Sequence, residues 1–203
     1  MKKAIILFLA VSITFCGFSQ STENLDYISP LHNGLAAVKK DGQWAFINQQ
    51  GEIIIDYRND LVITESSEGD FPIFMNDRCL IEEKRDGISY FGFINTKGKT
   101  VIQPQFLNAS NFNDGSAMVL EVFKEQVSSN KALGKNIVYD KYLKGIIDTQ
   151  GTIKTYLSPE RVSVILDKKF LKAPPEITSK YISKNLYAVK GKNNKWTVIY
   201  VNE

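Results

Sequence analysis

The chain has 203 residues, of which 43% are hydrophobic and 23% charged, and its formal net charge is +3 at pH 7. This length is enough for one domain with a substantial core. Without Lys2 and Lys3 the charge falls to +1, which argues against a nucleic-acid-binding protein because such proteins need a basic stripe.

The first residues have the features of a secretory signal peptide. Lys2 and Lys3 precede an apolar run over residues 4–15, and the small residues Gly17 and Ser19 follow. This pattern predicts cleavage after Ser19 and export to the periplasm or beyond.

Two alternatives to removal of residues 1–19 have to be weighed. A transmembrane anchor needs about 20 apolar residues, and this run is shorter. A lipoprotein anchor would use Cys16, but the bulky Phe15 stands where such sites usually have a small residue.

Apart from Cys16 the chain has one cysteine, Cys79, so we expect a mature protein with no internal disulfide and with Cys79 in the core.

Three segments repeat one pattern: a small residue, two apolar residues, Asn or Asp, two polar residues, Gly and an apolar strand. They are AFINQQGEIII (45–55), GFINTKGKTVI (92–102) and GIIDTQGTIKT (145–155). The glycines at the repeated turn are Gly51, Gly98 and Gly151, and the small residues that begin the segments are Ala45, Gly92 and Gly145.

A second motif comes earlier in each repeat and occurs four times. It reads GLAAV (34–38), DRCLI (77–81), GSAMV (115–119) and NLYAV (185–189). The chain therefore divides into four units, at approximately 25–73, 74–111, 112–175 and 176–203, which follow the signal peptide as one repeat domain at 20–203.

Turn chemistry makes each unit a meander of antiparallel strands. Asp41-Gly42 is a strong signal for a two-residue hairpin, and the segment NQQG supplies the second turn.

An isolated meander of three strands is marginal in water, so we expect the units to stack and cover one another. Pro104 and Pro174 are expected to end third strands or to turn the chain toward the next unit. The predicted fold is all-β, with repeated antiparallel three-stranded meanders.

The spacing between the two motifs is greatest in the third unit, where 32 positions separate Val119 from Gly151. Extra length is tolerated best at hairpin tips. This spacing predicts an extended loop over residues 124–142.

An aromatic residue precedes the small residue in two units and recurs in the fourth. These residues are Trp44, Phe91 and Trp196, and Lys144 takes the position in the third unit. Because they share one repeat position, we expect them to pack in the core; the alternative is an exposed platform for sugar rings.

The segments GLAAVKKDGQWAFINQQGEIII and YFGFINTKGKTVIQPQF resemble the WG repeat (KWG repeat) family. The resemblance covers most of residues 25–203 and is strongest in the first two units. Lys144 and Thr197 depart from the aromatic-glycine pair of that family. The resemblance implies an all-β repeat structure, found commonly in exported bacterial proteins with binding or scaffolding roles, and it carries over no catalytic residue.

The candidates for catalytic or metal chemistry are few. His32 is the sole histidine, beside Asn33-Gly34, and we interpret it as a loop residue and not a catalytic base. The segment NFNDGS (111–116) has oxygen donors but lacks the later acid of a calcium loop. No CxxC, HExxH or glycine-rich phosphate motif occurs, so no cofactor or metal is expected.

Acidic residues gather at Glu65, Glu68 and Asp70 and again at Glu82 and Glu83. Two facing carboxylates can hydrolyse glycosides, but we interpret the first cluster as a solvated loop. The hydrolase hypothesis is therefore the weakest.

The favoured hypothesis is a non-enzymatic module that binds a protein or cell-envelope partner through its loops. The candidate surfaces are the insertion, with Tyr139 and Tyr142, and the loop that carries Glu65, Glu68 and Asp70. A carbohydrate-binding module that uses exposed aromatic residues is the alternative.

Overall fold

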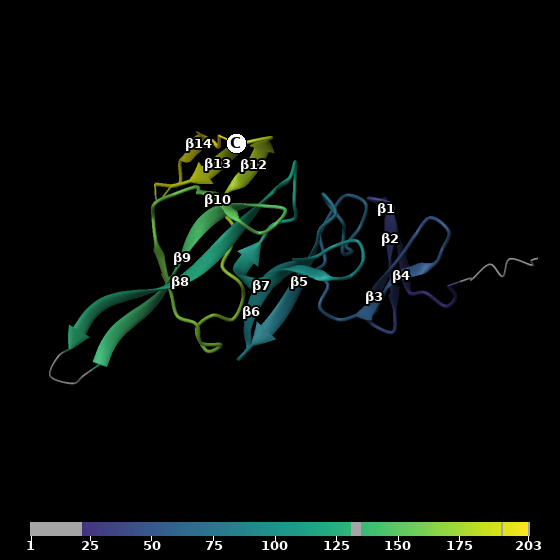
Figure 1. Ribbon diagram of the computed structural model, residues 1–203, viewed down its shortest axis with the longest axis horizontal. Coiled ribbons are helices and arrows are strands. Elements are labelled where there is room, and N and C mark those ends of the chain that lie inside the picture. Colours follow the sequence, from purple (N-terminus) through teal and green to yellow (C-terminus); the bar gives the residue numbers. More distant parts are fainter. Residues whose placement is uncertain (1–21, 131–134, 192, 203) are drawn as a thin grey trace, which may run out of the picture.

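The protein is built from antiparallel sheets, and a computed structural model describes residues 22–130, 135–191 and 193–202. Within these residues fourteen strands form three sheets, which follow one another along the chain (Figure 1). The prediction of an all-β repeat fold is confirmed. None of the described residues forms a helix, so the described part has no helix able to cross a membrane.

The first sheet contains the first predicted meander and one additional strand. Its strands, in spatial order, are β1 (Tyr27–His32), β2 (Leu35–Lys40), β3 (Gln43–Ile47) and β4 (Ile53–Arg58). Asp41 and Gly42 have φ angles of 49° and 80°, as the predicted hairpin turn requires. The sequence did not predict β1, where Pro30 interrupts the pattern at a register shift between Ile28 and Leu31.

The second sheet joins the second and third units. Its strands are β5 (Cys79–Arg85), β6 (Ile88–Ile94), β7 (Thr100–Ala109), β8 (Ser116–Asn130), β9 (Lys135–Asp148), β10 (Ile153–Tyr156) and β11 (Val162–Val164). The order is β10-β9-β8-β7-β6-β5, and β11 pairs with β9. Ala109 of β7 pairs with Val119 of β8, so β7 ends one unit and also flanks the next. The two meanders are thus continuous and not separate sheets.

The predicted loop over residues 124–142 is instead a two-stranded arm. β8 and β9 stay paired from Ser116 and Asp148 to Asn130 and Lys135, and the arm projects from the sheet (Figure 1). The reason is local: the segments VFKEQV and NIVYDKY are rich in β-branched and aromatic residues, which favour extended pairing over an irregular loop.

The third sheet is the smallest. It consists of β12 (Lys180–Ser183), β13 (Leu186–Lys190) and β14 (Trp196–Tyr200), in that order. The β13 and β14 hairpin corresponds to β2 and β3 of the first unit. Within the described part of the chain, β14 pairs with β13 alone, whereas β3 and β6 each pair with a third strand.

The second turn of the first three units is closed by the same hydrogen bonds. The backbone N–H groups of Gln50 and Glu52 both donate to Asn48 Oδ1 at 2.9 Å. Asn95 and Asp148 accept the two equivalent bonds in the next units at 2.9–3.0 Å. The repeated Asn or Asp therefore satisfies two backbone donors, and the glycine three residues later adopts positive φ.

The small residue of the second unit, Gly92, lies under the third strand of that unit. A Cβ on Gly92 would stand 2.4 Å from the Ile102 carbonyl oxygen and 2.6 Å from the Pro104 nitrogen. Phe91 pairs with Phe106 and Phe93 with Ile102, so three residues of β7 bulge across Gly92. Glycine is needed at position 92 because another backbone crosses it.

The same bulge explains why the expectation for Pro104 was wrong. Pro104 lies inside β7 and does not end it. It falls between the pairs made by Ile102 and Phe106, where the missing N–H costs no ladder bond. Pro174 lies outside the strands, in the segment before β12.

Successive units pack face to face. We call the side of each hairpin that meets the next unit its forward face and the opposite side its rear face. The forward faces consist of Ala37, Trp44 and Phe46, then Leu80, Phe91 and Phe93, then Met118 and Ile146. They contact the rear faces formed by Cys79, Ile81 and Ile94, then Ala117, Val119 and Ile147, then Tyr187, Val189 and Ile199. Each unit thus covers its neighbour.

The turn glycine of one unit sits on the third strand of the unit before it. A Cβ on Gly98 would lie 3.2 Å from Ile55, and one on Gly151 would lie 3.0 Å from Ile102. Arg58 donates to the Gly98 carbonyl oxygen at 3.1 Å. These contacts fix the register between units as well as the packing of their faces.

Cys79 gives a direct test of the packing between the first and second units. It is fully buried in a rear face, and burial raises the pKa of its thiol. We expect Cys79 to stay unlabelled by a thiol reagent in the folded protein and to react once urea unfolds it. Mass spectrometry of tryptic peptides locates the label; modification of Cys79 under native conditions would contradict this packing.

Candidate functional site

Charged groups pair with one another at the base of the arm. Glu125 on β8 pairs with Lys141 on β9 and lies 2.5 Å from Arg161 Nη1. The hydrogen bonds from Lys141 and Arg161 lower the pKa of the Glu125 carboxyl. The Arg161 guanidinium also lies 5.3 Å from the centroid of the Phe123 ring.

The two tyrosines predicted to bind lie in different environments. Tyr139 is 51% exposed. Tyr142 packs at the margin of an apolar cluster around Leu107 and Leu120, and its burial, together with the nearby Glu160 charge, raises the pKa of its phenol. Tyr139 is therefore the tyrosine that the arm presents to solvent.

The predicted binding loop at residues 65–72 is anchored to the first sheet. Its flanks pair where the Thr64 and Phe71 backbones exchange hydrogen bonds of 3.0 and 3.3 Å, and Phe71 is buried. His32 ends β1, stacks 5.6 Å from the Phe71 ring, and places its Nε2 3.1 Å from Glu68 Oε2. The sole histidine thus packs beside the loop, against the Phe71 ring.

The acidic residues of that loop lie at the surface. Glu65, Glu68 and Asp70 are all exposed. The loop packs on β1, whereas the arm extends from the second sheet away from it (Figure 1). The fold therefore does not bring the two predicted binding surfaces together.

The aromatic row is buried only in part, which corrects one expectation. Trp44 and Phe91 are each 6% exposed, but Trp196 is 45% exposed. Trp44 and Phe91 lie under the next unit, while within the described residues nothing packs on the forward face of β14. The three rings therefore do not form a joint sugar platform, and Trp196 alone offers an accessible indole.

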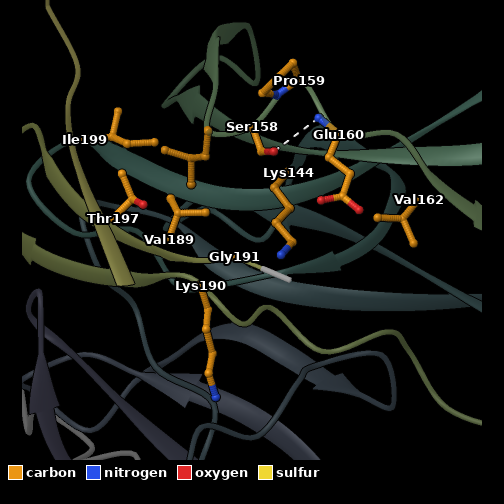
Figure 2. A pocket seen from close by; sticks show the side chains of 11 residues that line it. Lys144, Ser158, Pro159, Glu160, Val162, Val189, Lys190, Gly191, Thr197 and Ile199 are labelled. Atoms are coloured by element: carbon orange, nitrogen blue, oxygen red, sulfur yellow. Dashed lines mark hydrogen bonds between the residues drawn. The ribbon is translucent and has the colours of Figure 1, made fainter. Parts of the chain in front are cut away.

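A cleft of about 280 Å³ lies between the third and fourth units, at the position where Lys144 replaces the aromatic residue. Figure 2 shows Lys144, Ser158 and Glu160 on one side and Val189, Thr197 and Ile199 on the other. Lys144 Nζ donates to Thr178 Oγ1 at 2.8 Å, and the Glu160 N–H donates to Ser158 Oγ at 3.1 Å.

The cleft has polar groups over an apolar floor, a combination that suits binding of a small molecule. Sequence reasoning missed Ser158 and Glu160, which come from the segment after β10. The signals that could have found the cleft are the two departures from the repeat, Lys144 and Thr197, because both line it. In the part of the chain that the structure describes, no three His, Cys, Asp or Glu side chains are placed to hold a metal.

The comparisons with known proteins agree with the repeated strand pattern. The model of the WG containing repeat family matches residues 24–44 and 91–121. The first match covers β1, β2 and the start of β3, and the second runs from the end of β6 into β8. No curated protein and no solved structure matches the chain. The repeated turns and these matches show that the chain contains WG repeats, in the two segments that the family model covers.

Proposed function

We propose that the protein is an exported, non-enzymatic binding module that holds a partner protein through the arm of β8 and β9. The observation that carries this proposal is the preorganised arm. Glu125, Lys141 and Arg161 fix its base, and Tyr139 is presented in the open.

Preorganisation matters because binding is weakened by the entropy of ordering a loop. A paired hairpin has lost most of that entropy already. Tyrosine is among the residues that dominate interface energies, since it buries a large rigid ring at little entropic cost. The loop at residues 65–72 is proposed as a second contact, held in position by the buried Phe71 and its backbone hydrogen bonds with Thr64.

Export is proposed from the N-terminal pattern at residues 1–19, which lie outside the described residues. Lys2 and Lys3 before an apolar run favour secretion. The proposed partner is therefore a protein of the cell envelope or its surroundings.

Shortening the arm tests the proposal. Replacing residues 126–138 with Asn-Gly joins the paired residues Glu125 and Tyr139 by a two-residue turn. We expect the shortened protein to keep its circular dichroism spectrum and to lose the partner that the intact protein captures from envelope extract.

Two point variants sharpen that experiment. Tyr139→Ala should reduce capture of the same partner by at least about tenfold, the effect of one interface anchor. Lys97→Ala, at an exposed turn of the second unit, is the matched control and should bind normally. Full capture by both the shortened protein and Tyr139→Ala would exclude the arm as the binding surface.

A second candidate function, glycan binding, is favoured by the exposed Trp196 indole alone. Aromatic faces suit sugar rings. Titration with envelope glycans should then change tryptophan fluorescence in the unmodified protein and not in Trp196→Phe, in which the buried Trp44 remains. An unchanged signal in the unmodified protein would dismiss this alternative.

A further inference from the structure

Among the described residues, the first and the last unit each carry exposed apolar side chains, and these lie on opposite faces. On the forward face of the last unit, Trp196, Val198 and Tyr200 alternate along β14 and are 45%, 59% and 65% exposed. The equivalent residues Trp44 and Phe46 of the first unit are 6% and 1% exposed, because the second unit covers them.

The rear face of the first unit is the complementary surface. Ile28 pairs with Val38, Leu31 with Ala36, and Ile53 with Ile47, which puts these residues on the side opposite Trp44 and Phe46. Ile28, Leu31 and Ile53 are 60%, 50% and 41% exposed, whereas Val38 and Ala45 on the same side are buried, so the exposed apolar surface lies along the outer strands of the sheet. In the following units this side packs on the forward face of the preceding unit.

The charges of the two ends are also opposite. The first unit, residues 25–73, contains eight Asp or Glu and three Lys or Arg, whereas the last unit, residues 176–203, contains five Lys and two Glu. Next to the exposed apolar face, Lys180 Nζ and Lys190 Nζ lie 5.1 and 5.8 Å from the Trp196 ring centroid. An acidic first unit and a basic last unit attract one another.

We infer that copies of this chain associate head to tail, with the rear face of the first unit of one copy docked on the forward face of the last unit of another. The contact continues the interface that already joins successive units within the chain. Because it is heterologous, it extends into a filament or closes into a ring. This self-association uses the ends of the array and is independent of the arm.

A symmetric pairing of two forward faces is disfavoured. It would bring Lys180 and Lys190 of both copies together around the two Trp196 rings, and like charges facing across an interface are repulsive. An unrelated apolar partner would leave the charge difference between the two ends without a role. A second copy of this chain offers an apolar face and a charge that both complement the last unit.

Sedimentation of the full-length chain, purified after export by the expressing host, tests the inference. The weight-average mass should rise with concentration beyond that of a dimer, and added salt should lower it because salt screens the attraction. A mass that stays monomeric up to the solubility limit would overturn the inference.

Two variants distinguish head-to-tail contact from the alternatives. Val198→Glu places an acidic residue on the forward face of the last unit, where the acidic first unit of another copy repels it. Ile28→Lys places a basic residue on the rear face of the first unit, where the basic last unit of another copy repels it. Both sites are largely exposed, so the fold should be retained, as circular dichroism checks. Each variant alone should be monomeric, and an equimolar mixture should form dimers that grow no further.

The mixture is decisive because it leaves one intact forward face and one intact rear face. Dimers of Ile28→Lys alone would indicate symmetric forward-face pairing and overturn the inference. A mixture that stays monomeric would overturn it as well. The arm plays no part in these outcomes, so they are independent of the partner-capture experiment.

Discussion

Trp44→Ala is expected to lower the free energy of unfolding by about 3–5 kcal/mol, the usual cost of removing a buried aromatic side chain. Trp44 is 6% exposed and packs in the cluster that joins the first unit to the second. Its ring stands edge-on to Tyr27, with centroids 5.7 Å apart. Removing it opens a cavity between two units, so both sheets lose cover at once. The midpoint of urea unfolding, followed by circular dichroism, measures the change.

The chain supplies a matched control at the same repeat position. Trp196 is 45% exposed, so Trp196→Ala at low protein concentration should cost less than about 1 kcal/mol. The two variants remove the same side chain from the same place in two hairpins. Equal losses would mean that the forward face of the last unit is covered in solution even in dilute samples, contrary to the fold of the monomer.

Gly92→Ala is the second variant with a large expected effect, a loss of about 2–3 kcal/mol through overpacking. The new methyl group would meet backbone atoms: the Ile102 carbonyl oxygen at 2.4 Å, the Pro104 nitrogen at 2.6 Å and the Gln103 carbonyl carbon at 2.8 Å. Backbone cannot rotate away as a side chain does. The bulge of β7 must therefore lift from β6, and the pairing of Phe91 with Phe106 should weaken.

Gly145→Ala is the control for that variant. At this equivalent position in the third unit, the nearest atom to a new Cβ is the flexible end of Ile153, at 3.1 Å, and the nearest backbone atom is 3.6 Å away. We expect a loss of less than about 1 kcal/mol. Similar losses for Gly92→Ala and Gly145→Ala in calorimetric melts would show that the third strand does not cross Gly92 as described.

Local chemistry in the sequence was sufficient to predict most of the fold. Asp41-Gly42 encodes its turn by itself, because few residue pairs accept positive φ twice. Asn48, Asn95 and Asp148 close their turns with hydrogen bonds to residues two and four positions later. Such contacts depend on neighbours along the chain, so a pattern of residue types is enough to locate them.

Features that depend on distant segments were missed or misjudged. Pro104 was expected to end a strand, yet a bulge over Gly92 accommodates it. Residues 124–142 were expected to form a loop, although their own β-forming composition could have indicated the arm. The cleft at Lys144 depends on Ser158 and Glu160, which fold back from a segment with no repeat pattern.

The sequence by itself determined the turns within the units and the side of each strand that is apolar, because these follow from residue type and from the alternation of side chains. Tertiary structure alone decided which apolar faces are covered. Trp44 and Trp196 occupy the same repeat position, but one is buried and the other exposed. Whether a side chain is buried depends on what packs against it. The strands of the last unit do not by themselves specify what covers their forward face.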